Sequence, residues 1–346
     1  MGPDRGFGLA HQCRDIACHL PIDRWLIPGD PMERSDGPCR QEWIDRDLSF
    51  SEAEAWLDGL DVVLFVERPD FPTVVPAARR MGVRVICVPN WEWLSPSAAW
   101  LADVDLMLCP TRHTAGMLTE WKHCYRFEWE IACVPWPIDT SRIRFRRRRI
   151  CRQFVYVHGS GGARGVWCGD PETSVRRKGL EILRAAAELA PEIRLIIYAT
   201  SHDAPRFPTN VELRPPPDDN QLLYCDGDVC VQPSHWEGLG LPLLECQAAG
   251  MPLVTTDVAP MNEHQPLGTI PAKTEAMQIG QNFWIPAARI DPSQLAAVLR
   301  SFSGRRITMA SRRARRFVQR EHSWKIRKAQ IHQQIRRAIA TPVDIE

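Results

Sequence analysis

Short apolar runs alternate with longer stretches of helical periodicity along most of the chain. The runs that we interpret as buried strands are rich in Val, Ile and Leu: 61–67, 83–89, 105–111, 153–159, 193–199, 227–234 and 252–257. Such near-continuous apolar strands, separated by helices, are typical of parallel sheets that are covered on both faces. The pattern therefore predicts an α/β fold built from doubly wound parallel sheets.

One stretch interrupts this alternation and predicts a division into domains. Residues 138–150 carry six arginines and show no core periodicity, so we interpret them as a basic linker. We expect one domain at 1–137 and a second at 151–320. Residues 321–346 are then a C-terminal helix and tail, which continue an apolar stripe of helical spacing that includes Phe317.

Composition and charge narrow the class of protein. The 346 residues are 44% hydrophobic and 25% charged, as in ordinary globular proteins. The formal net charge is +1, but residues 301–346 hold 12 Lys and Arg against 3 Asp and Glu. The twelve cysteines include no CxxC pair, so we expect free thiols in a reducing compartment rather than disulfides or metal ligands. No secretory signal or membrane-spanning run is visible, and we expect a cytoplasmic location.

Two glutamates separated by seven residues mark the most informative stretch. Glu237 and Glu245 flank Gly238, Gly240 and Pro242, directly after a predicted strand. Ligands of open α/β sheets bind at the carboxyl ends of strands, and the start of a helix favours phosphate groups. Carboxylates do not bind phosphate, but they accept hydrogen bonds from hydroxyl groups. The combination predicts a site for a sugar attached to a nucleoside diphosphate.

The stretch PSHWEGLGLPLLECQAAGMPLVTTD resembles the E-x7-E signature of retaining glycosyltransferases of the GT-B fold, family 4, often called group 1. Four more segments resemble that family in the same order along the chain: VPWPID, RRKGLEILRAAAEL, DVCVQPS and REHSWKIRKAQ. The resemblance is specific over roughly 150–335 and is a general pattern over 1–150. It implies two Rossmann-like domains that face a cleft, with a C-terminal helix that crosses back to the first domain.

The resemblance also implies roles for individual residues. Glu245 resembles the glutamate that holds the nucleotide ribose. Glu237 resembles the one that faces the donor sugar, and Lys178 the lysine that neutralises the diphosphate; these two are the catalytic candidates. The other donor-binding candidates are Gly238, Leu239, Gly240, Leu241, Ser160, Gly161, Arg164 and Arg177. Arg164 and Arg177 are rivals for the family's phosphate-binding arginine. No metal cofactor is expected, because cationic side chains and helix ends stabilise the leaving diphosphate in such enzymes.

Polar residues also follow the predicted strands of the first domain. Asn90 and Glu92 follow the strand at 83–89, and His113 follows the strand at 105–111. Side chains at the carboxyl ends of parallel strands face the ligand side of a sheet, so these three are candidates for contacting the acceptor. Packing at the rim, together with neighbouring tryptophans, remains the alternative.

These observations predict a glycosyltransferase that moves a sugar from a nucleoside-diphosphate sugar to a glycan or lipid-linked acceptor with retention of configuration. A nucleotide-sugar epimerase of the same fold and an inactive or truncated homologue remain alternatives. The arginine runs lack a recognisable nucleic-acid module, so we expect no nucleic-acid partner. They do predict a weak peripheral contact with anionic membrane, while a plain solvated surface remains the alternative.

The start of the first domain departs from the usual pattern. Domains of this kind normally open with a buried strand, then a glycine-rich loop and a helix. Here the loop-like 5–8 and the helix-like 9–20 follow only four residues, and a strand of usual length needs about five or six. We therefore expect the first sheet to lack its opening strand and to leave an apolar slot beside 23–28 or 61–67.

Overall fold

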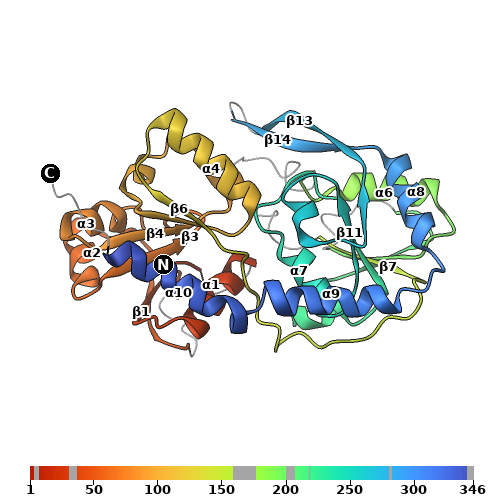
Figure 1. The fold of residues 1–346 in the computed structure, drawn as a ribbon, viewed down its shortest axis with the longest axis horizontal. Coiled ribbons are helices and arrows are strands. Elements are labelled where there is room, and N and C mark those ends of the chain that lie inside the picture. Colours follow the sequence, from red (N-terminus) through yellow and green to blue (C-terminus); the bar gives the residue numbers. More distant parts are fainter. Residues whose placement is uncertain are drawn as a thin grey trace. The chain divides into compact units, whose positions relative to one another are not determined.

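The computed structural model describes residues 1–3, 8–30, 37–158, 177–199, 207–217, 219–279 and 283–340. The chain forms two compact units (Figure 1). The second unit is the continuous segment Ile138–Ser323, and the first unit combines the residues before and after it. Both units hold parallel sheets with helices packed against them, which confirms the predicted α/β class.

The main sheet of the first unit has four parallel strands in the order in which they occur along the chain. They are β3 (Val62–Val66), β4 (Arg84–Val88), β5 (Leu106–Cys109) and β6 (Glu130–Cys133). The strands β4 and β5 are buried along their whole length, as expected for central strands of a covered sheet. The helices that follow the first and third strands are α3 (Val74–Met81) and α4 (Arg112–Tyr125).

A second, two-stranded parallel sheet in this unit pairs β1 (Arg24–Pro28) with β2 (Arg40–Ile44). The helices α1 (Gly8–His19) and α2 (Phe50–Leu57) flank these strands in the chain. A capping box begins α2: the side chains of Ser49 and Glu52 each accept a hydrogen bond from the other residue's backbone N–H. These N–H groups have no partner within the helix, so the capping box satisfies them.

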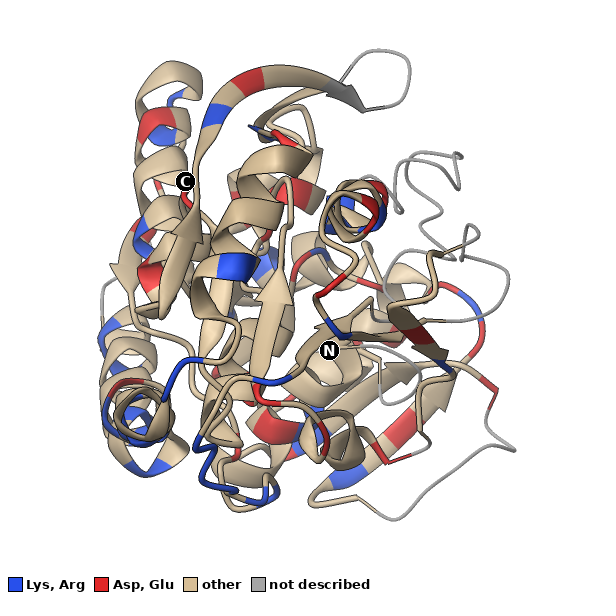
Figure 2. Ribbon diagram, turned by 90° about the vertical axis from the view of Figure 1, so that its right-hand side faces the viewer, with Lys and Arg blue, Asp and Glu red and all other residues tan. Residues whose placement is uncertain are grey.

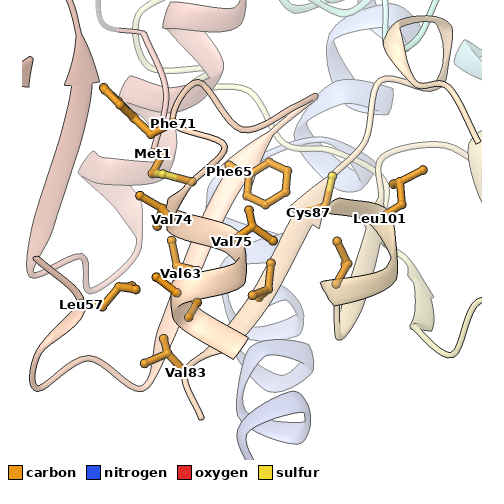
Figure 3. Packing of buried hydrophobic residues seen from close by; sticks show 14 of the residues in the cluster. Met1, Leu57, Val63, Phe65, Phe71, Val74, Val75, Val83, Cys87 and Leu101 are labelled. Atoms are coloured by element: carbon orange, nitrogen blue, oxygen red, sulfur yellow. The ribbon is translucent and has the colours of Figure 1, made fainter. Parts of the chain in front are cut away.

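The first three residues lie between the two sheets. The Met1 ammonium donates to Leu64 O of β3 at 2.5 Å, and Gly2 N donates to Leu26 O of β1 at 3.2 Å. Met1 is 8% exposed and belongs to the unit's core, beside Val63 and Phe71 (Figure 3). Residues 1–3 form no strand, and residues 4–7 lie outside the described part of the chain.

The second unit contains a six-stranded parallel sheet with the strand order β12-β11-β10-β7-β8-β9. Its strands are β7 (Phe154–Val157), β8 (Leu195–Tyr198), β9 (Val211–Arg214), β10 (Val229–Gln232), β11 (Leu253–Thr256) and β12 (Gly268–Ile270). The chain order reverses between β7 and β10, which is the kind of position where ligands bind in such sheets. The four central strands are fully buried and carry no Lys, Arg, Asp or Glu, so they appear tan in Figure 2.

Helices cover both faces of this sheet (Figure 1). The helices α6 (Leu180–Leu189) and α8 (Pro292–Phe302) pack together and share one core cluster with the sheet. On the other face α7 (Leu241–Ala248) packs against α9 (Thr308–Glu321). An antiparallel hairpin, β13 (Ala272–Ile279) with β14 (Phe283–Ile290), follows the last strand.

The C-terminal apolar stripe is divided between two helices. Phe317 is buried on α9 in the second unit, whereas α10 (Trp324–Ala340) belongs to the first unit. The Trp324 ring stacks on His19 at 4.8 Å and meets Trp136 edge-on at 6.0 Å. The periodicity continues across the break because both helices bury one face, each in its own unit.

The segment 138–150 differs from the predicted linker. It lies within the second unit, and Arg148 is 2% exposed. The Arg148 guanidinium donates to Arg146 O at 2.7 Å and also to Ala249 O and Tyr224 O. Hydrogen bonds from its arginines to backbone carbonyl groups help to hold this segment in place, and such contacts leave no apolar periodicity in the sequence.

Candidate functional site

The E-x7-E stretch lies at the carboxyl end of β10 and continues into α7. Gly240 takes the left-handed conformation with φ 72° at the start of α7, and a Cβ there would come within 2.5 Å of Leu243 Cδ1. Pro242 lies in the first turn, where a missing N–H costs nothing. The loop 237–240 is buried, while Leu241 is partly exposed. Gly240 therefore permits the tight turn that joins β10 to α7 at the carboxyl edge of the sheet.

Glu237 is held by two cationic side chains. It is 3% exposed, and Lys178 Nζ lies 2.6 Å from its Oε1. Arg177 Nη1 lies 3.7 Å from Oε2, and Ser234 Oγ donates to Oε1 at 2.8 Å. Burial by itself raises the pKa of Glu237, but Lys178, Arg177 and the hydrogen bonds outweigh it and hold that pKa below the usual value. The carboxyl group is therefore ionised at neutral pH.

The start of α6 is bound closely to the E-x7-E loop. Gly179 has φ 70°, and a Cβ there would lie 2.0 Å from Pro233 O, so only glycine allows this approach. His235 N donates to Arg177 O at 2.8 Å. Tyr156 OH donates to Lys178 O at 3.1 Å. These contacts place Arg177 and Lys178, which directly precede α6, beside the carboxylate of the loop.

Side chains from neighbouring strands brace the same loop. Thr256 Oγ1 donates to Ser234 O at 2.7 Å, and Gln232 Nε2 donates to Val157 O at 3.1 Å. His264 Nε2 lies 3.0 Å from Leu239 O. Burial, with a smaller effect of nearby His322, lowers the pKa of His264 to about 3, so its ring is neutral at pH 7. Two of these contacts reach carbonyl groups of the loop, those of Ser234 and Leu239.

Glu245 has a different environment from Glu237. It lies on α7 and is partly exposed, and Tyr224 OH donates to its Oε2 at 2.8 Å. Tyr224 thus offers Glu245 a neutral hydrogen-bond donor, whereas Lys178 and Arg177 place positive charge beside Glu237. Tyr224, Ser234 and His264 were not among the residues that the sequence singled out. Ser234 could have been found from its place three residues before Glu237, but nothing local to Tyr224 or His264 indicates their partners.

Three predicted donor residues cannot be placed. Ser160, Gly161 and Arg164 fall in 159–176, outside the described residues. Of the two rival arginines, Arg177 lies beside Glu237, as described above.

The three acceptor candidates gather at the carboxyl edge of the first unit's sheet. Asn90 Nδ2 donates to Glu67 Oε1 at 2.7 Å, and the His113 ring meets Trp91 edge-on at 5.3 Å. Asn90 is 6% exposed and Glu92 is 8% exposed, both just after β4. Glu67 takes the left-handed conformation with φ 65°, which is rare for a side chain with a Cβ and marks a constrained position.

In the part of the chain that the structure describes, no group of three or more His, Cys, Asp or Glu residues is arranged to hold a metal ion. None of the helices in that part combines the length and apolar character needed to cross a membrane.

Comparison with known proteins brings these observations together. Residues 165–281, which contain the E-x7-E loop, match the family model described as Glycosyl transferases group 1. No curated protein sequence matches the chain.

Several solved structures are similar to the chain. Sucrose-phosphate synthase from Thermosynechococcus elongatus has a TM-score of 0.65 at 15% identity, covering 98% of this chain and 95% of that one. WaaG, a glycosyltransferase involved in lipopolysaccharide biosynthesis, has a TM-score of 0.58 at 14% sequence identity. The match covers 96% of this chain and 97% of WaaG. HepE from Anabaena, solved with UDP and glucose, has a TM-score of 0.60 at 11% sequence identity, and the match covers 87% of each chain. Some of the similar proteins are longer than this chain. The chain spans 60% of the length of the matching chain in the GtfA/B complex, with 16% sequence identity and a TM-score of 0.58.

At these low sequence identities, the similarity to the solved structures establishes the fold alone. It is the GT-B arrangement of two Rossmann-like units, with a C-terminal helix that returns to the first unit. The match to the glycosyltransferase family model covers the segment that carries Lys178, Glu237 and Glu245.

Proposed function

We propose that this protein is a glycosyltransferase that moves a sugar from a nucleoside-diphosphate sugar to a glycan or lipid-linked acceptor, with retention of configuration. One observation carries the proposal. A buried, ionised Glu237 lies between Lys178 and the N-terminus of α7, at the ligand edge of a parallel sheet. A carboxylate beside a cationic side chain suits a ligand that presents both hydroxyl groups and phosphate groups.

The donor is proposed to bind with its diphosphate against Lys178, Arg177 and the first backbone N–H groups of α7. A helix start and two cations offset the charge of a diphosphate, and they do so most strongly as the bond to the sugar breaks. Glu237 accepts hydrogen bonds from sugar hydroxyls, and Glu245 accepts them from the ribose. The UDP and glucose named for HepE are ligands of this chemical class.

Retention is proposed to follow from displacement on one face of the sugar. The bond from the anomeric carbon to the diphosphate breaks as the acceptor oxygen bonds on the same face. The departing phosphate oxygen takes the acceptor's proton, so charge and atoms balance without an enzyme nucleophile. The chain contributes position and electrostatic stabilisation. The proposal includes no metal cofactor.

The acceptor is proposed to contact the first unit through Asn90, Glu92 and His113. Their gathering at the carboxyl edge of that sheet, together with Glu67, supports the assignment. The lipopolysaccharide pathway named for WaaG supports a glycan or lipid-linked acceptor as the class to test first.

A weak peripheral contact with anionic membrane is proposed as well, for a protein that works in the cytoplasm. Two stretches of the second unit, 144–152 and 305–313, lie side by side, since Cys151 N donates to Arg305 O and Ile307 N to Arg149 O, each at 2.9 Å. Their exposed arginines have no ion-pair partner among the described residues: Arg144, Arg146, Arg147, Arg149, Arg152, Arg305, Arg306, Arg312 and Arg313.

The membrane contact predicts co-sedimentation with phosphatidylserine vesicles at 20 mM salt and its loss at 500 mM salt, because screened charges attract weakly. Each engaged arginine contributes about 1 kcal/mol near an anionic surface. An absence of binding at low salt contradicts this contact and leaves sugar transfer untouched.

The experiment for the main proposal has two stages. Thermal-shift measurements with UDP, GDP, ADP and their sugars select the donor, because a ligand that binds only the folded state raises its stability. The selected donor is then incubated with and without glycan acceptors, and NMR of the product reads the anomeric configuration. Isomerised donor without acceptor indicates an epimerase, inversion contradicts the proposed mechanism, and the absence of any reaction in either arm contradicts the activity.

A further inference from the structure

We propose that Tyr224 is a positioning residue for the nucleotide, which fixes the carboxylate of Glu245 so that it can bind the ribose. The inference rests on the donor site proposed above and adds to it a residue that the signature does not contain. Tyr224 ends the short helix η4 (Asn220–Tyr224), before β10, and Glu245 lies on α7, after β10.

The contact between the two residues has the ordinary distance of a hydroxyl hydrogen bond. Tyr224 OH donates to Glu245 Oε2 at 2.8 Å, and the tyrosine is 3% exposed. Burial, together with the charge of Glu245, raises the pKa of Tyr224 well above its usual value, so the phenol stays protonated at every working pH. The hydroxyl therefore donates to the carboxylate and never competes with it as an anion.

The backbone on both sides of this contact is held by one guanidinium. Arg148 donates to Tyr224 O and to Ala249 O, and Ala249 is the C-cap residue of α7. The positive charge also suits the C-terminal end of that helix. Arg148 thus fixes the distance between η4 and α7, which explains how a tyrosine 21 residues away in the chain meets Glu245.

The consequence for binding is a preorganised carboxylate. A glutamate has three rotatable bonds, and a ligand that immobilises it loses affinity to side-chain entropy. A carboxylate that already accepts a hydrogen bond from Tyr224 loses less side-chain entropy, so two vicinal ribose hydroxyls can bind it more tightly. Removal of the phenol oxygen should weaken the binding of a ribonucleotide and leave a nucleotide without these hydroxyls almost unaffected.

The test compares Tyr224→Phe, Glu245→Gln and wild type by isothermal titration calorimetry. The probe is whichever of UDP, GDP and ADP binds wild type, together with its 2′,3′-dideoxy counterpart. Tyr198→Phe serves as the matched control, because it also removes the phenol oxygen of a buried tyrosine in the second unit, to which Arg214 Nη1 donates at 3.5 Å. Donor KM and kcat are measured for the same proteins.

We expect Tyr224→Phe to bind the ribonucleotide about three- to tenfold more weakly, as for one lost hydrogen bond. Binding of the dideoxy counterpart and kcat at saturating donor should stay within twofold of wild type, while the donor KM rises. Tyr198→Phe should match wild type throughout. Glu245→Gln should abolish most of the preference for ribose.

The other outcomes overturn the inference in distinguishable ways. Wild-type affinity in Tyr224→Phe, with Glu245→Gln weakened, shows that Glu245 needs no positioning while the donor site stands. If Tyr224→Phe loses the same affinity for the ribonucleotide and for its dideoxy counterpart, Tyr224 has only a structural role. If none of the three diphosphates binds wild type, the proposed function fails and this inference fails with it.

Discussion

Replacement of Glu237 by Gln provides a sharp test of how the site is held together. The change keeps the shape of the side chain and its hydrogen bond with Ser234 but removes the negative charge. Lys178 and Arg177 then remain as neighbouring cations, at sites where their side chains are only 10% and 12% exposed. A buried charge that loses its partner keeps its desolvation cost without the compensating attraction.

The magnitude follows from burial. Breaking a buried ion pair by removing one partner costs about 3–5 kcal/mol, and the amide of Gln recovers part of this through hydrogen bonds. We therefore expect a loss of about 3 kcal/mol in the free energy of unfolding. In a unit of this size, such a loss lowers Tm by roughly 6–12 °C.

The effect should depend on pH in a definite direction. Because the folded-state pKa of Glu237 is lowered, its charge stabilises the fold fully above the ordinary glutamate pKa. That contribution is lost as the pH falls through the folded value. The stability gap between wild type and Glu237→Gln should therefore be constant between pH 8 and pH 6 and should narrow below about pH 4.3.

Differential scanning calorimetry at pH 7 and pH 4 measures both effects. Glu188→Gln is the matched control, since Glu188 pairs with Arg184 at the same 2.6 Å but at the surface, where the pair is worth at most about 0.5 kcal/mol. Equal losses in the two variants at pH 7 would refute the reasoning from burial. A gap that does not narrow at pH 4 would show that the ionised carboxylate is not its source.

Three other predictions concern binding, backbone and chemistry. Glu245→Gln should weaken nucleotide binding roughly 10- to 100-fold, through the loss of about 1.5–3 kcal/mol, and unchanged affinity in calorimetry rules out the ribose role. Gly179→Ala should lower the free energy of unfolding in urea by about 1–3 kcal/mol or more, because the added Cβ would meet Pro233 O and the backbone there is left-handed. A free energy of unfolding equal to that of wild type would contradict the close approach. Sugar transfer should survive EDTA at full rate, and restoration of a lost activity by Mg²⁺ or Mn²⁺ would show that a metal takes part.

The sequence predicted best what depends on neighbouring residues. The strands at 229–232 and 253–256 begin with the apolar residues Val-Cys-Val and Leu-Val, and the turn between β10 and α7 is marked by glycine and proline. Each of these signals lies within a few residues of the structure it specifies. The pairing of Lys178 with Glu237 spans 59 residues. The resemblance to a family implied that both residues belong to the site, but no signal in the sequence indicated that they pair.

What the sequence could not show depends on distant partners. Arg148 sits in a run of arginines that resembles a solvated linker, yet it is buried because carbonyl groups 76 and 101 residues away surround its guanidinium. The stripe on the last two helices has one period, but the chain changes unit between Ser323 and Trp324. Periodicity records that a face is buried and gives no information about what covers it.

The second unit has its two ends side by side. Ile138 N donates to His322 O at 2.9 Å, and Ile138 pairs with Ser323 as an isolated bridge. A continuous segment whose ends meet has the form of an inserted module, because it can be joined to a host at a single point. Segment 138–323 is therefore suited to circular permutation, or to transplantation into a related scaffold, with its donor-site ion pair intact.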